Sequence, residues 1–143
     1  MKITPAEKTD YGILRTLFLQ ERRSTFYWLD PSVFQLKDFD SLTKGETILI
    51  ARIGETVVGF ISIWMKNCFI HHLYVDQDHQ SKGIGSALLK AAIQITDLPI
   101  TLKCLENNSR AVIFYQQKGF SIKERGLSEH GPYILFELTG SIK

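Results

Sequence analysis

The sequence has 143 residues, of which 44% are hydrophobic and 22% are charged. These values are ordinary for a soluble globular protein with one core, so we expect a single domain over residues 1–143. The formal net charge of +2 and a longest Lys/Arg run of two residues argue against nucleic acid or an anionic membrane as a partner. The sequence shows neither the apolar segment of a signal peptide nor a membrane span. Its two cysteines, Cys68 and Cys104, do not have the spacing of a metal or redox site. We therefore expect a cytoplasmic protein with free thiols.

The first third of the chain predicts one short strand and two helices. "KITPA" is typical of a strand that ends near Pro5. "DYGILRTLFLQERR" predicts an amphipathic helix, because its apolar residues recur at helical spacing, and Thr9 or Asp10 is the candidate N-cap. In "WLDPSVFQLKDFDSL", an aspartate followed by a proline is typical of a helix start, so we expect the second helix to begin at Pro31.

The middle of the chain predicts three consecutive strands. "ETILIARI", "TVVGFISIWM" and "CFIHHLYV" are rich in β-branched and aromatic residues. The segments at 54–55 and 66–67 between them are short and turn-like. Strands joined by tight turns form an antiparallel meander.

The last part of the chain predicts two helices and three strands. Apolar residues recur at helical spacing from Ile84 to Ile95, and "SRAVIFYQQK" predicts a second helix, capped by residues 107–109 and ended by Gly119. "LPITLKCL", "FSIKER" and "PYILFEL" are the strands. The helix before "LPITLKCL" makes this strand parallel to "CFIHHLYV". We therefore predict an α/β (α+β) fold whose mixed, mostly antiparallel sheet carries helices on its faces.

A glycine-rich joint, "VDQDHQSKGIGSALL", connects the third strand of the meander to a helix. The first N–H groups of a helix have no internal partner, and glycines let an anion approach the backbone, so the joint is suited to a phosphate. No Walker-type motif is present, and a dinucleotide fingerprint fails because Leu88 stands where Gly or Ala is required. Two interpretations of the joint remain: a Q-x-x-G-x-G loop from Gln80 to Gly85, or a plain tight turn.

Two segments together resemble the GCN5-related N-acetyltransferase (GNAT) superfamily, in particular its short bacterial single-domain members. "LYVDQDHQSKGIGSALL" matches the family's strand, Q-x-x-G-x-G loop and helix start, and "NSRAVIFYQQKGF" matches N-x-x-A-x-x-F-Y-x-x-x-G-F. The predicted element order matches the family over essentially the whole chain. The resemblance implies about seven strands and about four helices, with the sheet splayed between the fourth and fifth strands.

The resemblance also implies acetyl-CoA as co-substrate and a set of residues that bind it. The loop residues Gln80, Ser81, Lys82, Gly83, Ile84, Gly85 and Ser86 would hold the pyrophosphate, and Asn108 would bond the CoA arm. Main-chain groups of Leu73, Tyr74 and Val75 would meet the pantetheine and the thioester. Tyr115 takes the family position of the general acid, although it could also be an ordinary packing aromatic.

Two neighbouring histidines, His71 and His72, are the candidates for the general base. If side chains alternate regularly along "FIHHLYV", His71 shares a face with Phe69, Leu73 and Val75, and His72 faces the other way. His71 matches a position where serotonin N-acetyltransferases also carry a histidine, so we expect it to be the base. The alternatives are that both histidines only pack, or that a bulge brings His72 to the site. Neighbouring histidines that point apart predict no metal, and we see no carboxylate on the same face.

These features predict an acetyl-CoA-dependent N-acetyltransferase that moves the acetyl group to a primary amine within a ternary complex. The alternatives are a non-catalytic acyl-CoA-binding domain or, less favoured, a nucleotide-binding module. The acceptor could be a small amine, a protein lysine or an N-terminal amine, and a homodimer is left open. The aromatic segment around Asp30 could hold an amine or form a helix–helix core, and residues 129, 130 and 133 of the last hairpin are candidates for another wall. We expect both cysteines to be inert.

Overall fold

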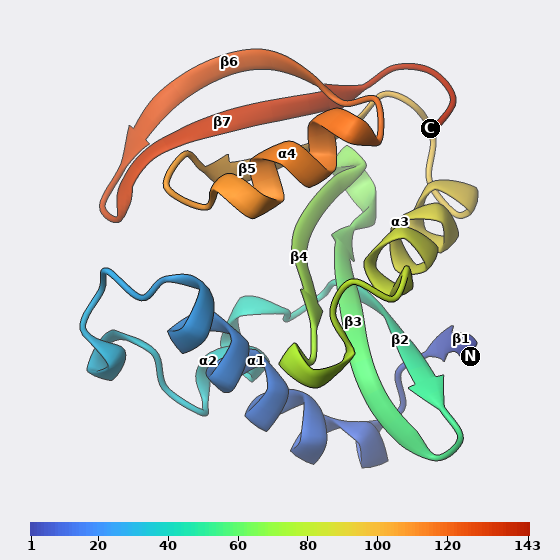
Figure 1. The fold of residues 1–143 in the computed structure, drawn as a ribbon. Helices are drawn as coiled ribbons and strands as arrows, with labels where there is room; N and C mark the ends of the chain where they lie inside the picture. Colours follow the sequence, from blue (N-terminus) through green and yellow to red (C-terminus); the bar gives the residue numbers. More distant parts are fainter.

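The computed structural model describes residues 1–143, and one seven-stranded sheet runs through them in the order β1-β2-β3-β4-β5-β7-β6 (Figure 1). Only β4 and β5 pair in parallel, as the helical crossover between them predicts. The fold prediction is confirmed. The strands are β1 (Lys2–Pro5), β2 (Thr47–Ile53), β3 (Thr56–Trp64), β4 (Phe69–Val75), β5 (Ile100–Leu105), β6 (Ser121–Ser128) and β7 (Gly131–Leu138).

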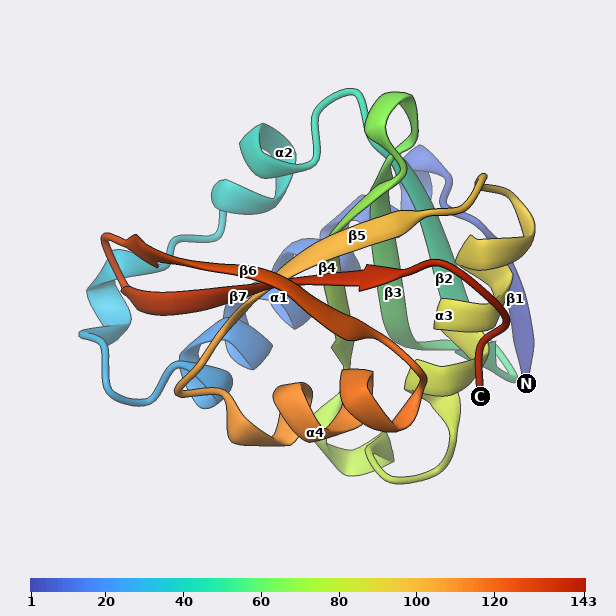
Figure 2. The same cartoon turned by 90° about the horizontal axis from the view of Figure 1, so that it is seen from above.

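Four helices pack against the sheet from both sides, and Figure 2 shows α2 and α4 on opposite sides of it. They are α1 (Tyr11–Thr25), α2 (Asp38–Leu42), α3 (Ile84–Gln94) and α4 (Ser109–Gln117). The second helix does not begin at Pro31, so that prediction is wrong. Asp30 does cap a turn by accepting a hydrogen bond from the Ser32 N–H, but the turn ends at Val33 and the chain becomes extended at Phe34. No helix in the structure is long and apolar enough to span a membrane.

The two faces of the sheet bury two separate apolar clusters. Along β2, Ile48 and Ile50 join α1 and α2 in one cluster, whereas Leu49 and Ala51 join α3 in the other. This alternation follows from the two-residue period of a strand. The four residues from Ile48 to Ala51 are all apolar because both faces of the strand are covered. α3 also lies close to the sheet, since a Cβ at Gly59 would come within 3.3 Å of Leu88.

The sheet opens between β4 and β5, as expected. Their ladder contains only two residue pairs, Phe69–Thr101 and Ile70–Leu102. β5 then follows β7, with which it pairs along six residues, and Figure 1 shows β4 and β5 diverging toward α1. The edge of β4 from His71 to Val75 therefore has no strand partner on the β5 side. This opening positions the candidate site.

Candidate active site

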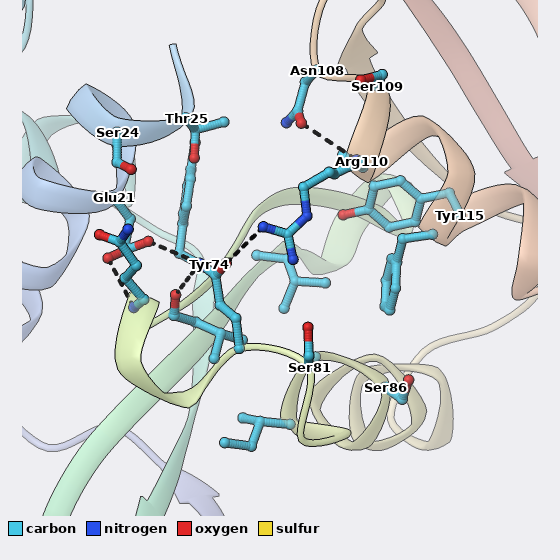
Figure 3. Close-up of a pocket in the computed structure, with 18 of the residues that line it drawn as sticks. Glu21, Ser24, Thr25, Tyr74, Ser81, Ser86, Asn108, Ser109, Arg110 and Tyr115 are labelled. Carbon is cyan, nitrogen blue, oxygen red and sulfur yellow. Dashed lines mark hydrogen bonds between the residues drawn. The ribbon is translucent and has the colours of Figure 1, made fainter. Parts of the chain in front are cut away.

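A cavity of about 700 Å³ lies where β4, α3 and α4 meet, with the C-terminal part of α1 as a further wall (Figure 3). Eleven of the twelve residues predicted to bind a cofactor line it. They are Leu73, Tyr74, Val75, Gln80, Ser81, Gly83, Ile84, Gly85, Ser86, Asn108 and Tyr115. The exception is Lys82, whose exposed side chain is not part of the lining.

The loop before α3 presents six consecutive unpaired backbone donors. None of the N–H groups from Ser81 to Ser86 donates a hydrogen bond within the chain, and the first helical bond in this region runs from Ala87 to the Gly83 carbonyl. Ser81 and Gly83 both have positive φ, +64° and +81°, so the loop turns sharply into the helix. Unpaired donors at a helix N-terminus favour an anion, which is what the sequence predicts for this loop.

Gln80 fixes the start of this loop to three other elements, β4, α1 and α4. Its Nε2 donates to the Val75 carbonyl (3.0 Å) and to Glu21 Oε1 (3.1 Å), and its Oε1 accepts from Arg110 Nη1 (3.3 Å). Figure 3 shows Arg110 reaching from α4 across the cavity. Glu21 is buried, and burial raises its pKa. Sequence reasoning missed both residues, because Glu21 lies in a distant helix and Arg110 occupies a variable position of its motif.

Asn108 and Tyr115 reach the cavity from α4. Asn108 Oδ1 accepts a hydrogen bond from the Ala111 N–H and so caps the helix, which leaves the amide Nδ2 free as a donor. The Tyr115 hydroxyl has no partner within the chain, and Figure 3 shows it pointing into the cavity. Burial raises the pKa of Tyr115, so the phenol is neutral at physiological pH and keeps a proton to donate.

A second cavity, of about 250 Å³, adjoins the first. Leu73, Tyr74 and Tyr115 line both cavities, so the two meet at the open edge of β4. Their common boundary also includes Asn108 and Ala111. The second cavity is further lined by Arg22, Phe26, His71, His72, Lys103, Cys104 and Leu105. Each cavity therefore has access to the same short stretch of unpaired backbone.

A bulge in β4 brings both histidines to the second cavity. Ser62 pairs with His72 and Ile63 pairs with Ile70, so His71 is an extra residue without a partner in β3. The rings of His71 and His72 stack at 3.8 Å between centroids. The strand is therefore not regular, and the bulge named above as an alternative is present. His71 does not share a face with Leu73, because the bulge resets the alternation: Ile70 and Leu73 both pack on the α3 side.

A carboxylate, which the sequence reasoning did not find, contacts His71. Glu46, the residue before β2, has a side chain only 6% exposed, and its Oε2 lies 2.6 Å from His71 Nδ1. Its other oxygen accepts a hydrogen bond from the Ser62 hydroxyl. Because a carboxylate only accepts, His71 carries its proton on Nδ1, and Nε2 is left without a partner in the chain.

Glu46, His71 and His72 form a compact group whose ligand atoms lie within 4.8 Å of one another. Imidazole lone pairs lie in the ring plane, and the two rings are stacked at an interplanar angle of 28°. One ring would have to turn before both could bind one ion, so this arrangement fits a metal poorly. Burial lowers the pKa of His72 to about 3, so this ring is neutral. The expected absence of a metal stays a prediction, with stacking rather than divergence of the rings as its reason.

Of the residues predicted as possible walls of an acceptor pocket, only some line a cavity. Phe26 lines the second cavity, but Asp30 lines neither cavity and is engaged with Ser32. The hairpin residues Glu129, His130 and Tyr133 are absent from both linings. Burial raises the pKa of the Cys104 thiol to about 12, which agrees with the expectation of an inert cysteine.

Comparison with known proteins gives consistent results. A family model described as "Acetyltransferase (GNAT) family" matches residues 13–120. The fold resembles the solution structure of apo-form YjaB from Escherichia coli (19% identity over 98% of both chains, TM-score 0.79). It also resembles PaiA N-acetyltransferase from Thermoplasma acidophilum in complex with coenzyme A (19% identity, 98% of this chain and 100% of the other, TM-score 0.78). A third similar structure is ribosomal-protein-alanine N-acetyltransferase from Brucella melitensis (15% identity, 98% and 100% of the chains, TM-score 0.73).

Proposed function

Because the chain belongs to the acetyltransferase (GNAT) family, we propose that it transfers the acetyl group of acetyl-CoA to a primary amine by direct attack within a ternary complex. The observation that carries this proposal is the meeting of two cavities at one strand edge. The larger cavity has the unpaired loop donors, and the smaller one is lined by His71, whose Nδ1 is bonded to Glu46 behind the lining. Such an arrangement lets a donor and an acceptor approach the same point from opposite sides.

Acetyl-CoA fits the larger cavity by its chemistry. The pyrophosphate is an anion that the N–H groups from Ser81 to Ser86 suit, and the pantetheine amides suit the unpaired backbone of β4. The similar protein from Thermoplasma acidophilum was solved with coenzyme A, which supports this donor. N–H groups of the open β4 edge would also polarise the thioester carbonyl as negative charge develops on its oxygen.

The two proton transfers fall to His71 and Tyr115. The amine nitrogen attacks the carbonyl carbon, the C–S bond breaks, and the nitrogen loses a proton. The unpaired Nε2 of His71 accepts this proton, and Glu46 stabilises the resulting imidazolium. The neutral Tyr115 phenol gives its proton to the departing thiolate.

The Gly85→Asp substitution tests the anion site without disturbing the fold. A Cβ at this position would make only ordinary contacts, the nearest at 3.6 Å to Phe114, and an acidic residue in the first turn of α3 favours the helix. A carboxylate there repels a pyrophosphate, so we expect the Kd for CoA to rise by about tenfold or more, or ~1.4 kcal/mol, in calorimetric titration.

Gly12→Asp is the matched control for this substitution. Gly12 is the second residue of α1, as Gly85 is of α3, and has open space around its Cβ position. We expect this variant to bind CoA normally. If both variants weaken CoA binding equally, or neither does, the loop is not the anion site.

Steady-state release of CoA thiol, measured with a panel of primary amines, tests the proposed function as a whole. We expect thiol release that depends on the amine, and a product heavier than the amine by one acetyl group in mass spectrometry. Tight binding of acetyl-CoA with no turnover on any amine would instead support a non-catalytic acyl-CoA-binding domain.

A further inference from the structure

We propose that the acceptor is a small amine that carries a carboxylate near its amino group, and that Arg22 and Lys103 bind this carboxylate. The inference rests on the proposed function, since it assigns the second cavity to the acceptor. Its basis is the charge of the lining: two residues with permanent positive charge, two histidines and no carboxylate. The volume of about 250 Å³ is enough for a small amino acid.

Arg22 is held rigidly at one wall of this cavity. Its guanidinium lies 4.6 Å from the centre of the Phe18 ring and 4.4 Å from that of Phe34, and its side chain is only 14% exposed. Nη1 donates to Asp38 at 3.2 Å, and the other guanidinium nitrogens have no acceptor within the chain. A fixed guanidinium with unused donors is suited to a carboxylate.

Lys103 reaches the cavity from β5, on the opposite side of the splay. Its ammonium lies 4.8 Å from the centre of the Tyr133 ring and has no acidic partner. The Tyr133 ring lies against Gly126 of β6, where a Cβ would come within 2.5 Å of it. The glycine thus makes room for the ring, and the ring positions Lys103 by a cation–π contact. Tyr133 shapes this wall indirectly, through Lys103.

The acids near the cavity are already engaged. Asp38 accepts hydrogen bonds from Arg22 and from the Gln35 N–H. Glu46 is bonded to His71 and Ser62. Asp38 balances the charge of Arg22, so Lys103 is the cation left without a counter-charge. An acceptor that brings its own carboxylate supplies this charge, whereas a basic peptide adds a like charge to the site.

Matched pairs of substrates test the inference on the unmodified protein. We would measure kcat/KM for amino acids and for their carboxamides, such as alanine with alaninamide and β-alanine with its amide, together with an N-terminally blocked lysine peptide. For the best pair we expect the kcat/KM of the acid to exceed that of the amide by about tenfold or more. The α-amide is the weaker base and has more neutral amine, which works against this result and makes the test stringent.

Two variants then connect the preference to Lys103. Lys103→Met keeps the aliphatic stem and removes the charge, and we expect it to reduce the acid-to-amide ratio at least fivefold. Lys123→Met is the matched control, because Lys123 is paired with Glu137 and lines neither cavity. The acid-to-amide ratio of kcat/KM should stay unchanged in this variant. Equal rates for acids and amides, better rates for the basic peptide, or an unchanged ratio in Lys103→Met would overturn the inference.

If no amine is turned over, the proposed function fails. Calorimetric binding of the same pairs to the CoA-saturated protein then decides the inference separately. A preference for the acids that Lys103→Met removes would support it, and equal binding or no binding of acids would overturn it.

Discussion

Replacing Glu46 with glutamine is expected to lower kcat by about 10- to 100-fold and to leave the KM for acetyl-CoA unchanged. The amide is isosteric and can still bond Ser62 or His71. If its NH₂ faces Nδ1, the imidazole proton moves to Nε2, which can then no longer accept a proton from the amine. If its oxygen faces Nδ1, the proton stays on Nδ1, but the imidazolium loses its counter-charge. Initial rates with acetyl-CoA and the best amine measure the effect.

The double variant shows whether Glu46 acts through His71. We expect His71→Ala alone to lower kcat by about 10²-fold and to make the remaining activity depend more steeply on high pH, because the amine must then lose its proton to water. Adding Glu46→Gln to His71→Ala should lower kcat hardly any further, because the effects of substituting two residues that act as one unit are not additive. Additive losses would mean that Glu46 has only a structural role. Glu137→Gln, at a surface ion pair, is the control.

Replacing Tyr115 with phenylalanine is expected to lower kcat by about 10²-fold and to leave the Kd for CoA within about twofold. This decrease in kcat is at the low end of the range for loss of a general acid, because a thiolate is already a fair leaving group. The hydroxyl has no partner in the chain, so we expect no loss of thermal stability. Tyr11→Phe, in α1, is the control, and an unchanged kcat in Tyr115→Phe would remove Tyr115 as the acid.

The raised pKa of Tyr115 also predicts the shape of the pH profile. Burial favours the neutral phenol, so Tyr115 retains the proton that we propose it donates as the pH rises past the usual tyrosine pKa. We therefore expect no decline of kcat caused by this residue up to about pH 10. A decline near neutral pH that disappears in Tyr115→Phe would contradict this expectation.

The cavity that we propose for acetyl-CoA could be predicted from the sequence because its residues are local. The loop from Gln80 to Ser86 and the cap at Asn108 each depend on residues a few positions apart, and glycine and asparagine have strong local preferences. The element order followed in the same way from periodicity and turns. Even here the sequence alone does not say which way the exposed Lys82 side chain points, and in the structure this side chain does not line the cavity.

The cavity that we propose for the acceptor could not be predicted, because it depends on contacts between distant segments. Glu46 meets His71 only through the register of β2, β3 and β4, and the bulge at His71 changes that register by one residue. A one-residue shift reverses the face of every side chain that follows, so regular alternation gave the wrong neighbours for His71. Arg22 and Lys103 likewise come from elements that only the splayed sheet brings to one cavity.

The central claim is direct transfer from acetyl-CoA at the loop of α3 to an amine in the second cavity. A single-turnover experiment tests it most directly: the protein is mixed with an equal amount of isotopically labelled acetyl-CoA, with and without an amino acid, and the label is followed by mass spectrometry. We predict that the label moves to the amine only when both substrates are present and never resides on the protein. Label on the protein before the amine is added, or no transfer to any amine, would contradict the account.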